Sequence, residues 1–325
     1  MSFVSNVRRR EEMSRKIKVS TLSGELLFIP YEGGMEEAVI NMIHYWEGRL
    51  SKILYDKPDL IVLPECCDRY GSFNSKQQLE YYNYRGSRIL EYFSDVAKEN
   101  NCYIAYSTIM CAEDGRNRNS VIMIDRQGKV MGRYHKHNLV IGEAEAIEGL
   151  CGKDAVIFDC DFGRVGAVIC FDFNFEEIRN LYKEEKPDLM IFSSLYHGSF
   201  MQNFWAYELR SWLVTSIGLN NYSSVINPVG TKIAETSNYR NWLTHEINLD
   251  CFVAHLDLNW DKVEKAKHKY GAGLCVHEPG NLGAMLLTSE IEDILIDEIV
   301  KEFRIEHIDE YFARSIKYAN ENREP

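Results

Sequence analysis

The spacing of apolar residues along this chain changes between a helical and a strand-like period, and these changes predict its elements. Residues 18–23 have the composition of a strand. After Gly33 and Gly34, apolar residues recur every three or four positions, which predicts a long helix with one buried stripe. This stripe consists of Val39, Met42, Ile43, Trp46, Leu50, Ile53 and Leu54.

A connector of four residues, Lys57-Pro58-Asp59-Leu60, follows this helix. Proline cannot continue the helix, and the apolar residues 61–63 predict a strand. The same four residues return as Lys186-Pro187-Asp188-Leu189, between a predicted helix, 175–185, and a predicted strand, 190–193. This repetition indicates a duplicated α/β plan, although a coincidence of four identical residues would look the same.

The remaining pattern adds helices, strands and hairpins on both sides of the second connector. Hairpins are expected where two apolar runs flank a short turn that contains glycine. The predicted elements are a helix over 77–99, a strand over 103–110, a hairpin of 120–125 with 130–134, a helix over 204–213, a hairpin of 223–227 with 231–235, a last strand over 251–256 and an acidic helical segment over 289–320.

Three of the predicted strands deliver a chemically active side chain at their ends. Glu65 follows one, Lys136 follows another, and Cys170 ends an apolar run directly before carboxylates and an apparent helix start. Taken alone, a cysteine is more often a buried apolar residue. A glutamate, a lysine and a cysteine held at one sheet edge, however, suit cysteine-based acyl transfer. The glutamate takes the thiol proton, and the lysine favours the thiolate and neutralises oxygen charge on the tetrahedral intermediate.

The order Glu65, Lys136, Cys170, with the residues around them, resembles the nitrilase or carbon–nitrogen hydrolase superfamily. The shared motifs are strand-Pro-Glu, strand-Lys with Leu139 three residues later, and Gly-x-x-Ile-Cys-x-Asp-x-x-Phe-x-Glu, and the resemblance runs over about 17–258. It implies an α/β fold, the four-layer αββα sandwich in which two sheets pack face to face under outer helices. It also implies that Cys170 is the nucleophile, that the Phe171 backbone N–H and the Lys136 ammonium stabilise the oxyanion, and that no cofactor is needed.

The resemblance implies further site residues. A second catalytic glutamate is expected in the loop after the lysine, where Glu143, Glu145 and Glu148 stand, and the offset to Gly149 favours Glu143. Asp172 is expected to have a structural or helix-capping role, because anions are favoured at a helix N-terminus. The substrate pocket is expected to involve Phe171 and the aromatic segment that contains Tyr196, His197, Phe200, Phe204 and Trp205, although ordinary core aromatics would give the same pattern.

Two departures from the family pattern concern the substrate. Asn174 stands where the family often has an arginine, which disfavours a carbamoyl amino acid, although Arg179 and Arg210 remain candidates for binding a carboxylate. Phe171 and Asp172 stand where nitrile hydrolysers usually have tryptophan and glutamate. We therefore expect hydrolysis of a small amide through a thioester on Cys170. The alternatives are an N-carbamoyl hydrolase, a nitrilase or, from another class, a non-catalytic binding protein with the same fold.

The amino-acid composition indicates which kinds of partner and which cellular compartment to expect. A net charge of −12 disfavours nucleic-acid and anionic-membrane partners. No apolar run approaches the ~18 residues of a membrane span, and the N-terminal segment lacks the apolar part of a secretory signal. Nine cysteines without paired spacing indicate a reducing compartment, and His135 and His137 lack a third ligand for a metal. We expect a cytoplasmic protein without a metal.

No linker or break in composition divides the 325 residues into two domains, so we expect one large domain with a tail at each end. The three segments are an N-terminal tail over 1–16, one large hydrolase domain over 17–288 and a C-terminal helical extension over 289–325. The extension has an apolar face among acidic residues, and in the family such extensions often wrap a partner subunit. We therefore expect a homodimer or a higher homo-oligomer. The apolar face consists of Ile291, Ile294, Leu295, Ile299, Val300 and Phe303.

Overall fold

The computed structural model describes residues 15–28, 33–277 and 281–324. Its contacts divide the chain into two compact units. One unit spans 17–247, and the other combines 248–325 with the start of the chain. The first unit contains every residue proposed for the site. Most of the predicted N-terminal tail lies outside the described residues.

A six-stranded sheet carries Glu65 and Lys136. Its parallel strands β1, β2 and β3 lie side by side, and β4 and β5 continue it in antiparallel pairing. The strands, in spatial order, are β12 (Trp242–Asn248), β1 (Lys16–Leu22), β2 (Leu60–Val62), β3 (Tyr103–Cys111), β4 (Asn117–Ile124) and β5 (Val130–His135).

A second six-stranded sheet carries Cys170 and repeats this plan. Strands β7, β8 and β9 are parallel neighbours, with antiparallel strands on both sides. The strands, in spatial order, are β11 (Lys232–Glu235), β10 (Ser224–Ile226), β9 (Trp212–Ile217), β8 (Leu189–Ser194), β7 (Gly163–Ile169) and β6 (Ile157–Cys160).

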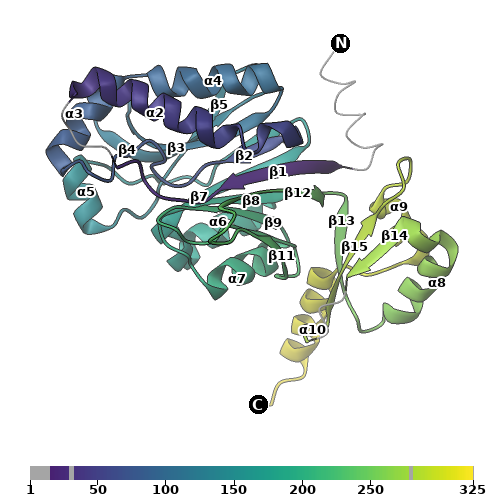
Figure 1. Ribbon diagram of the computed structural model, residues 1–325. Helices are drawn as coiled ribbons and strands as arrows, with labels where there is room; N and C mark the ends of the chain where they lie inside the picture. The colour runs from purple at the N-terminus through teal and green to yellow at the C-terminus, as the bar shows by residue number, and fades with distance from the viewer. Residues whose placement is uncertain (1–14, 29–32, 278–280, 325) are drawn as a thin grey trace, which may run out of the picture. The chain divides into compact units, whose positions relative to one another are not determined.

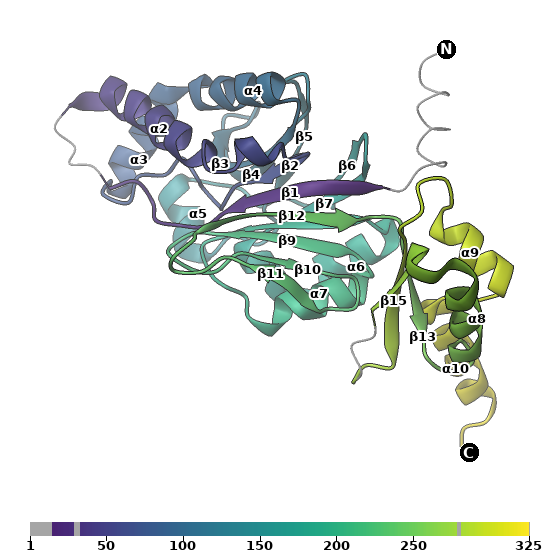
Figure 2. The ribbon, with the colours of Figure 1, turned by 45° about the vertical axis from the view of Figure 1, so that its right-hand side comes forward.

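Helices cover the outer faces of the two sheets, so the unit has four layers (Figures 1 and 2). Helices α2 (Gly34–Leu50) and α4 (Arg88–Asn100) lie over the first sheet. Helices α6 (Glu176–Glu185) and α7 (Phe200–Leu209) lie over the second. The αββα sandwich expected from the resemblance is confirmed.

The predicted apolar stripe of α2 packs onto the first sheet. Val39, Met42 and Trp46 are at most 2% exposed and belong to one apolar cluster with Ile61 and Ile104 of the sheet. Burial of such side chains contributes roughly 1.5–3 kcal/mol each. The stripe therefore supplies much of the stability of this half of the sandwich.

The two Lys-Pro-Asp-Leu connectors occupy matching places in the two sheets. Asp59 donates its N–H to Lys18 O at 2.8 Å and accepts the Lys18 N–H at 3.0 Å. Asp188 makes the same pair with Arg164, at 2.9 and 2.8 Å. Each connector therefore sets a central parallel strand beside its neighbour, as a duplicated α/β plan requires.

Some predicted helices have different bounds in the structure. The helix predicted over 77–99 is two helices, α3 (Ser75–Arg85) and α4, because Gly86 between them adopts a φ of 53° that does not continue a helix. The helix predicted over 204–213 begins and ends earlier, as α7. Trp212 and Leu213 belong to the buried strand β9, and the short apolar run at its start, residues 212–214, has no period that separates it from a buried helix.

The second unit has its own sheet and its own core. Strand β13 (Cys251–His255), predicted as the last strand, is followed by β14 (Leu274–His277) and β15 (Ala284–Ser289), and β15 pairs with both of the others. Because β13 pairs with β15 and not with a strand of the sandwich, the division falls at residue 248 rather than at the predicted 288.

The C-terminal extension contributes to this second core. Helix α9 (Ile296–Phe303) buries Ile296, Ile299 and Val300 in a cluster with residues of β13, β15 and α8 (Trp260–Tyr270). The apolar face predicted for 289–320 therefore packs on its own unit, and the preference for a second subunit is wrong for this face. In α10 (Ile308–Glu321), only Ile308 is buried. No helix within the described residues is both long and apolar enough to span a bilayer.

Candidate active site

Glu65, Lys136 and Cys170 lie around one cavity of about 550 Å³. Glu65 follows β2 and Lys136 follows β5 of the first sheet, whereas Cys170 follows β7 of the second. The cavity therefore forms where the ends of both sheets meet. The three side chains that the sequence placed at strand ends come together as predicted.

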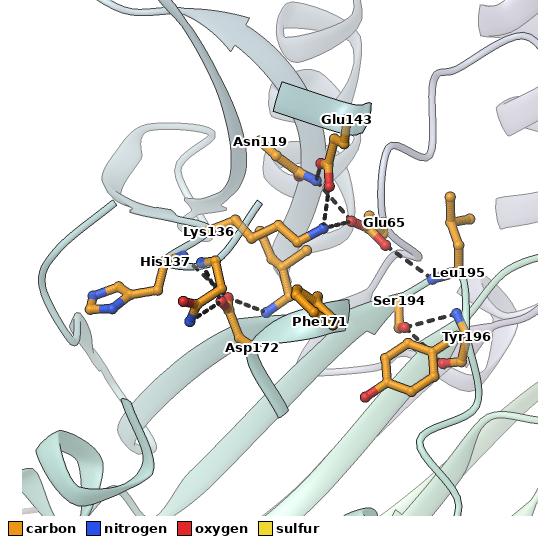
Figure 3. A network of polar contacts seen from close by, with 12 residues as sticks. Glu65, Asn119, Lys136, His137, Glu143, Phe171, Asp172, Ser194, Leu195 and Tyr196 are labelled. Carbon is orange, nitrogen blue, oxygen red and sulfur yellow. Dashed lines mark hydrogen bonds and ion pairs between the residues drawn. The ribbon is translucent and has the colours of Figure 1, made fainter. Parts of the chain in front are cut away.

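The Lys136 ammonium lies between two carboxylates (Figure 3). Its Nζ is 2.8 Å from Glu65 Oε1 and 2.7 Å from Glu143 Oε2, and the lysine side chain is only 1% exposed. Burial alone would lower the pKa of Lys136, but the charges of Glu65 and Glu143 raise it above its usual value. Lys136 is therefore a fixed, permanently charged ammonium in the cavity wall.

Asn119 of β4 holds the two carboxylates in place. Its Nδ2 donates to Glu65 Oε1 at 2.8 Å and to Glu143 Oε1 at 2.6 Å. Glu143 lies on the short helix α5 (Ile141–Ile147), whereas Glu145 is exposed and does not line the cavity. The structure thus places Glu143 against Lys136, in agreement with the preference for Glu143 over Glu145 as the second glutamate of the site. Asn119 was not predicted as a site residue, because it stands among other polar residues at the start of β4 and nothing in the sequence distinguishes it from them.

A backbone group of the second sheet fixes the other oxygen of Glu65. Leu195, directly after β8, donates its N–H to Glu65 Oε2 at 3.1 Å (Figure 3). Ser194 before it bonds to the Tyr196 backbone through its hydroxyl, which shapes this turn. Glu65 is therefore held by groups from both sheets and is 3% exposed. A backbone donor leaves no signal in a sequence, so it could not have been predicted.

Cys170 occupies a strained position at the exit of β7. Its φ of 48° lies in the left-handed region, which is uncommon for a residue with a side chain and occurs often at functional sites. Burial and the nearby negative charge of Glu65 raise the pKa of its thiol to about 12, more than Lys136 lowers it. The side chains of Ser194 and Glu65 lie close to the thiol. At neutral pH the resting group is thus a neutral thiol beside a carboxylate.

Asp172 links the two catalytic segments. Its buried carboxylate accepts a hydrogen bond from Tyr134 Oη at 2.7 Å and another from Asn138 N at 2.8 Å. It also accepts a longer bond, of 3.3 Å, from Ile169 N. Tyr134 and Asn138 flank Lys136, and Ile169 precedes Cys170. The structural role expected for Asp172 agrees with these contacts.

The structure does not place the predicted aromatic pocket residues in the cavity. Trp205 is fully buried, donates its Nε1–H to Phe173 O at 3.1 Å and stacks on the Phe173 ring, so it is a core residue. His197 accepts the Ser199 N–H through Nδ1 at 3.1 Å. The side chains of Phe171, Tyr196, His197 and Trp205 are all absent from the cavity lining. A run of aromatic residues after a strand therefore does not show whether their side chains belong to the core or line a substrate pocket.

Helices α3 and α5 and the loop after Glu65 form the cavity wall instead. The polar part of this wall includes Arg69 and Gln78, which the sequence analysis did not single out. The apolar part consists of Phe73, Leu79, Ile109, Val140, Ala146, Ile147 and Leu195. The cavity thus combines an apolar surface with a few polar groups, as small-molecule sites usually do.

The surroundings of the cavity contain no metal-binding cluster among the described residues. Within residues 15–28, 33–277 and 281–324, no three His, Cys, Asp or Glu side chains are arranged to hold a metal ion. His135 instead shares a hydrogen bond of 2.7 Å between its Nδ1 and Ser120 Oγ. All nine cysteines are free thiols.

The sequence that forms this site matches a known protein family. The family model described as "Carbon-nitrogen hydrolase" matches residues 36–251, well over half of the chain. This chain belongs to the carbon–nitrogen hydrolase family. The match includes Glu65, Lys136, Glu143 and Cys170 and ends where the second unit begins.

Curated members of the family share low sequence identity with this chain. A "Deaminated glutathione amidase" of Dictyostelium discoideum is 25% identical over 174 residues, 48% of this chain and 59% of that protein. A "Pantetheinase" of Canis lupus familiaris is 30% identical over 151 residues, 43% of this chain and 29% of that protein. The "Omega-amidase NIT2" of Homo sapiens is 24% identical over 203 residues, 54% and 71% of the two chains. The match thus spans less than two thirds of the first two relatives.

Solved structures of the nitrilase superfamily share the fold. Nit3 of Saccharomyces cerevisiae, a member of branch 10 of the superfamily, has a TM-score of 0.61 at 19% identity, over 73% of this chain and 91% of that one. An amidase from Nesterenkonia sp. has a TM-score of 0.56 at 14% identity, over 71% and 90%. At such identities the likeness establishes the architecture and leaves the substrate open.

Proposed function

We propose that this chain hydrolyses a small amide through a thioester on Cys170. The observation that carries the proposal is the contact of Glu65 with both other groups. Its carboxylate bonds to the Lys136 ammonium at 2.8 Å and lies beside the Cys170 thiol in the lining of the same cavity. A base, a fixed cation and a nucleophile therefore face one cavity, which is the arrangement that acyl transfer through a thiol requires.

In the first half-reaction, Glu65 accepts the proton of Cys170 as the sulfur attacks the amide carbonyl. Because the thiol is neutral at rest, deprotonation accompanies the attack rather than preceding it. The Lys136 ammonium and the Phe171 backbone N–H stabilise the negative oxygen of the tetrahedral intermediate. The protonated Glu65 then passes its proton to the leaving nitrogen, and ammonia or an amine departs from the thioester.

In the second half-reaction, water replaces the amine. Glu65, again a carboxylate, takes a proton from the water as its oxygen attacks the thioester carbonyl. The same oxyanion donors act, the carbon–sulfur bond breaks, and the proton returns to the Cys170 sulfur. Glu143 keeps the Lys136 ammonium in place through both steps, since it is its second carboxylate partner.

The charge arrangement favours an enzyme over a binding protein with the same fold. A buried ammonium between two carboxylates carries a large desolvation cost, and a charged group held in this way in a cavity wall is a candidate for chemistry. Within enzymes, Phe171 and Asp172 after the cysteine favour an amide over a nitrile, and Asn174 disfavours a carbamoyl amino acid.

Ammonia release from a panel of primary amides, ureido acids and nitriles tests the proposal. The expected result is turnover of amides, together with an acyl adduct on the Cys170 peptide in mass spectra of acid-quenched enzyme. Cys170→Ala should retain the melting temperature and less than about a thousandth of the activity. Cys275→Ala, an exposed cysteine of the second unit, is the matched control and should retain full activity. Activity in Cys170→Ala, or turnover restricted to nitriles, would contradict the proposal.

A further inference from the structure

We propose that a second cavity of the first unit binds a small organic anion through Arg133. This cavity has a volume of about 290 Å³. It lies on the outer face of the first sheet, where the junction of α3 and α4 meets strands β3, β4 and β5. Glu65, Lys136 and Cys170 do not line it, so the inference goes beyond the proposed amide hydrolysis and does not depend on it.

Arg133 directs its side chain to the outer face of the sheet. It pairs with Ile122 across β4 and β5, and Ile122 belongs to the apolar cluster under α2 and α4. The preceding Gly132 faces the other way, because a Cβ there would approach the ring of Phe158 in the second sheet. Successive side chains of a strand point to opposite faces, so Arg133 lies on the same face as the second cavity.

The Arg133 guanidinium is an unpaired cation of this cavity wall. Among the described residues it forms no hydrogen bond and no ion pair, and the residue is exposed. The arginines close to it are neutralised, since Arg85 pairs with Asp68 at 2.8 Å and Arg118 pairs with Asp114 at 2.6 Å. One positive charge is therefore left for a ligand, and solvent reaches it.

His135 shows that the potential at this edge of the sheet is positive. It stands two residues after Arg133 in β5 and therefore on the same face. Burial lowers the pKa of His135, and the charges of Arg118 and Arg133 lower it further, against the opposing effect of Asp114. A local potential that disfavours a further cation favours an anion.

The rest of the lining combines polar groups with apolar surface. Asn83, exposed near the end of α3, has a side-chain amide without a hydrogen-bond partner among the described residues. Ser87 donates its hydroxyl proton at 2.6 Å to Glu91, which does not line the cavity. The apolar lining includes Leu90, Ile109, Met110 and Ile122. Such a lining fits an anion that carries a short apolar body.

A buried network holds the back wall of the cavity in place. Arg85 donates through Nη2 to Thr108 Oγ1 at 2.8 Å and to Ile109 O at 2.6 Å. Asp68 accepts the hydroxyl protons of Tyr106 and Thr108, both at 2.7 Å. These five residues are at most 5% exposed. The wall is thus formed before any ligand binds, and binding has to order little more than the Arg133 side chain.

The second cavity adjoins the cavity at Cys170. Tyr82 and Ile109 line both cavities, so they form part of the wall between them. Each cavity also has an arginine that the other lacks, Arg69 at Cys170 and Arg133 in the second cavity. Loss of binding on replacement of one or the other arginine therefore shows which cavity holds an anion.

Calorimetry of the full chain with benzenesulfonate and with benzenesulfonamide tests the proposal. The two probes have the same ring and nearly the same shape, but only the sulfonate is charged at neutral pH. We expect the wild type to bind the sulfonate at least about tenfold more tightly than the sulfonamide. Arg133→Gln should weaken binding of the sulfonate about tenfold to a hundredfold, because a guanidinium forms two charge-assisted hydrogen bonds with such an anion. Its melting temperature should not change, since Arg133 makes no contact that the replacement would break.

Two further variants make the test specific. Asn83→Asp places a carboxylate in the exposed part of the lining and should weaken binding of the sulfonate while leaving the sulfonamide within about twofold. Arg69→Gln, the matched control in the cavity at Cys170, should leave the affinity for the sulfonate within about twofold.

The outcomes separate this inference from the proposed hydrolysis. Cys170→Ala should bind benzenesulfonate as tightly as the wild type, because the nucleophile does not line the second cavity. Binding that is lost in Arg69→Gln and kept in Arg133→Gln would place the anion at Cys170 and overturn the proposal. Equal affinity for the two probes, or no binding of the sulfonate at millimolar concentration, would also overturn it. None of these results bears on ammonia release from amides.

Discussion

Tyr134 donates its hydroxyl proton to the Asp172 carboxylate at 2.7 Å, and this bond joins the two sheets beside the site. Tyr134 belongs to the strand that delivers Lys136, and Asp172 to the turn that begins at Cys170. The distance between the oxyanion cation and the nucleophile therefore depends on this buried pair.

Replacing Asp172 by Asn should damage activity more than stability. All groups that bond to Asp172 are donors, so the amide N–H₂ of an asparagine would face at least one of them. We expect a loss of about 1–3 kcal/mol in the free energy of unfolding, measured in urea. We expect kcat to fall with little change in KM, because the substrate wall at α3 is untouched. Tyr134→Phe, which removes one bond, is the control and should cost about 1 kcal/mol.

Lys136→Ala should abolish turnover and also destabilise the protein. Without the ammonium, Glu65 and Glu143 would be two close, partly buried carboxylates with no cation, for which losses of about 3–5 kcal/mol are usual. Lys136→Arg keeps the charge but should not restore kcat, because the planar guanidinium is larger than the ammonium that fits between the carboxylates. Near-normal kcat in Lys136→Arg would show that diffuse positive charge is enough and would remove the oxyanion role.

The pH dependence of Cys170 alkylation should follow its raised pKa. Because the pKa is raised to about 12 from a usual 9.0, the thiolate fraction is small at neutral pH and keeps growing in alkali. Alkylation of the Cys170 peptide by iodoacetamide should therefore rise about tenfold per pH unit beyond pH 9, where an ordinary thiol levels off. Peptide-resolved mass spectrometry separates Cys170 from the exposed Cys111, which serves as an internal reference.

The same experiment with Glu65→Gln tests the cause of the shift. Removing the negative charge lowers the pKa of Cys170, so alkylation at neutral pH should become faster while turnover is lost. A rate that levels off near pH 9 in the wild type, or slower alkylation in Glu65→Gln, would contradict the assignment of Glu65 as a carboxylate beside a neutral thiol.

Truncation separates the core role of α9 from any role of α10 in assembly. A chain that ends at Ser289 loses Ile296, Ile299 and Val300 from the second core and should unfold that unit, with a lower melting temperature. A chain that ends at Ser315 loses residues 316–324, all of which are exposed, together with the final residue, and it should melt normally. Light scattering of this shorter chain and of the full chain tests the proposed homodimer. Two monomers at micromolar concentration would exclude it.

The sequence by itself determined the local elements and the chemistry at their ends. The period of its apolar residues placed α2 and its buried stripe, and the two connectors predicted the strands that they start. The motifs around Glu65, Lys136 and Cys170 carried the family assignment. These features are local, since each depends on residues within a few positions of one another, so they can be read before the chain is folded.

Only the tertiary structure decided which residues meet at the site. Asn119, the Leu195 N–H, Arg69 and Gln78 reach the cavity through strand pairing and helix packing, which join segments far apart in the sequence. The tertiary structure likewise decided that Trp205 is buried in the core and does not line the cavity. The division at residue 248 followed from the pairing of β13 with β15 across an intervening helix and strand. Such long-range contacts are set by the packing of the whole domain and leave little local signal.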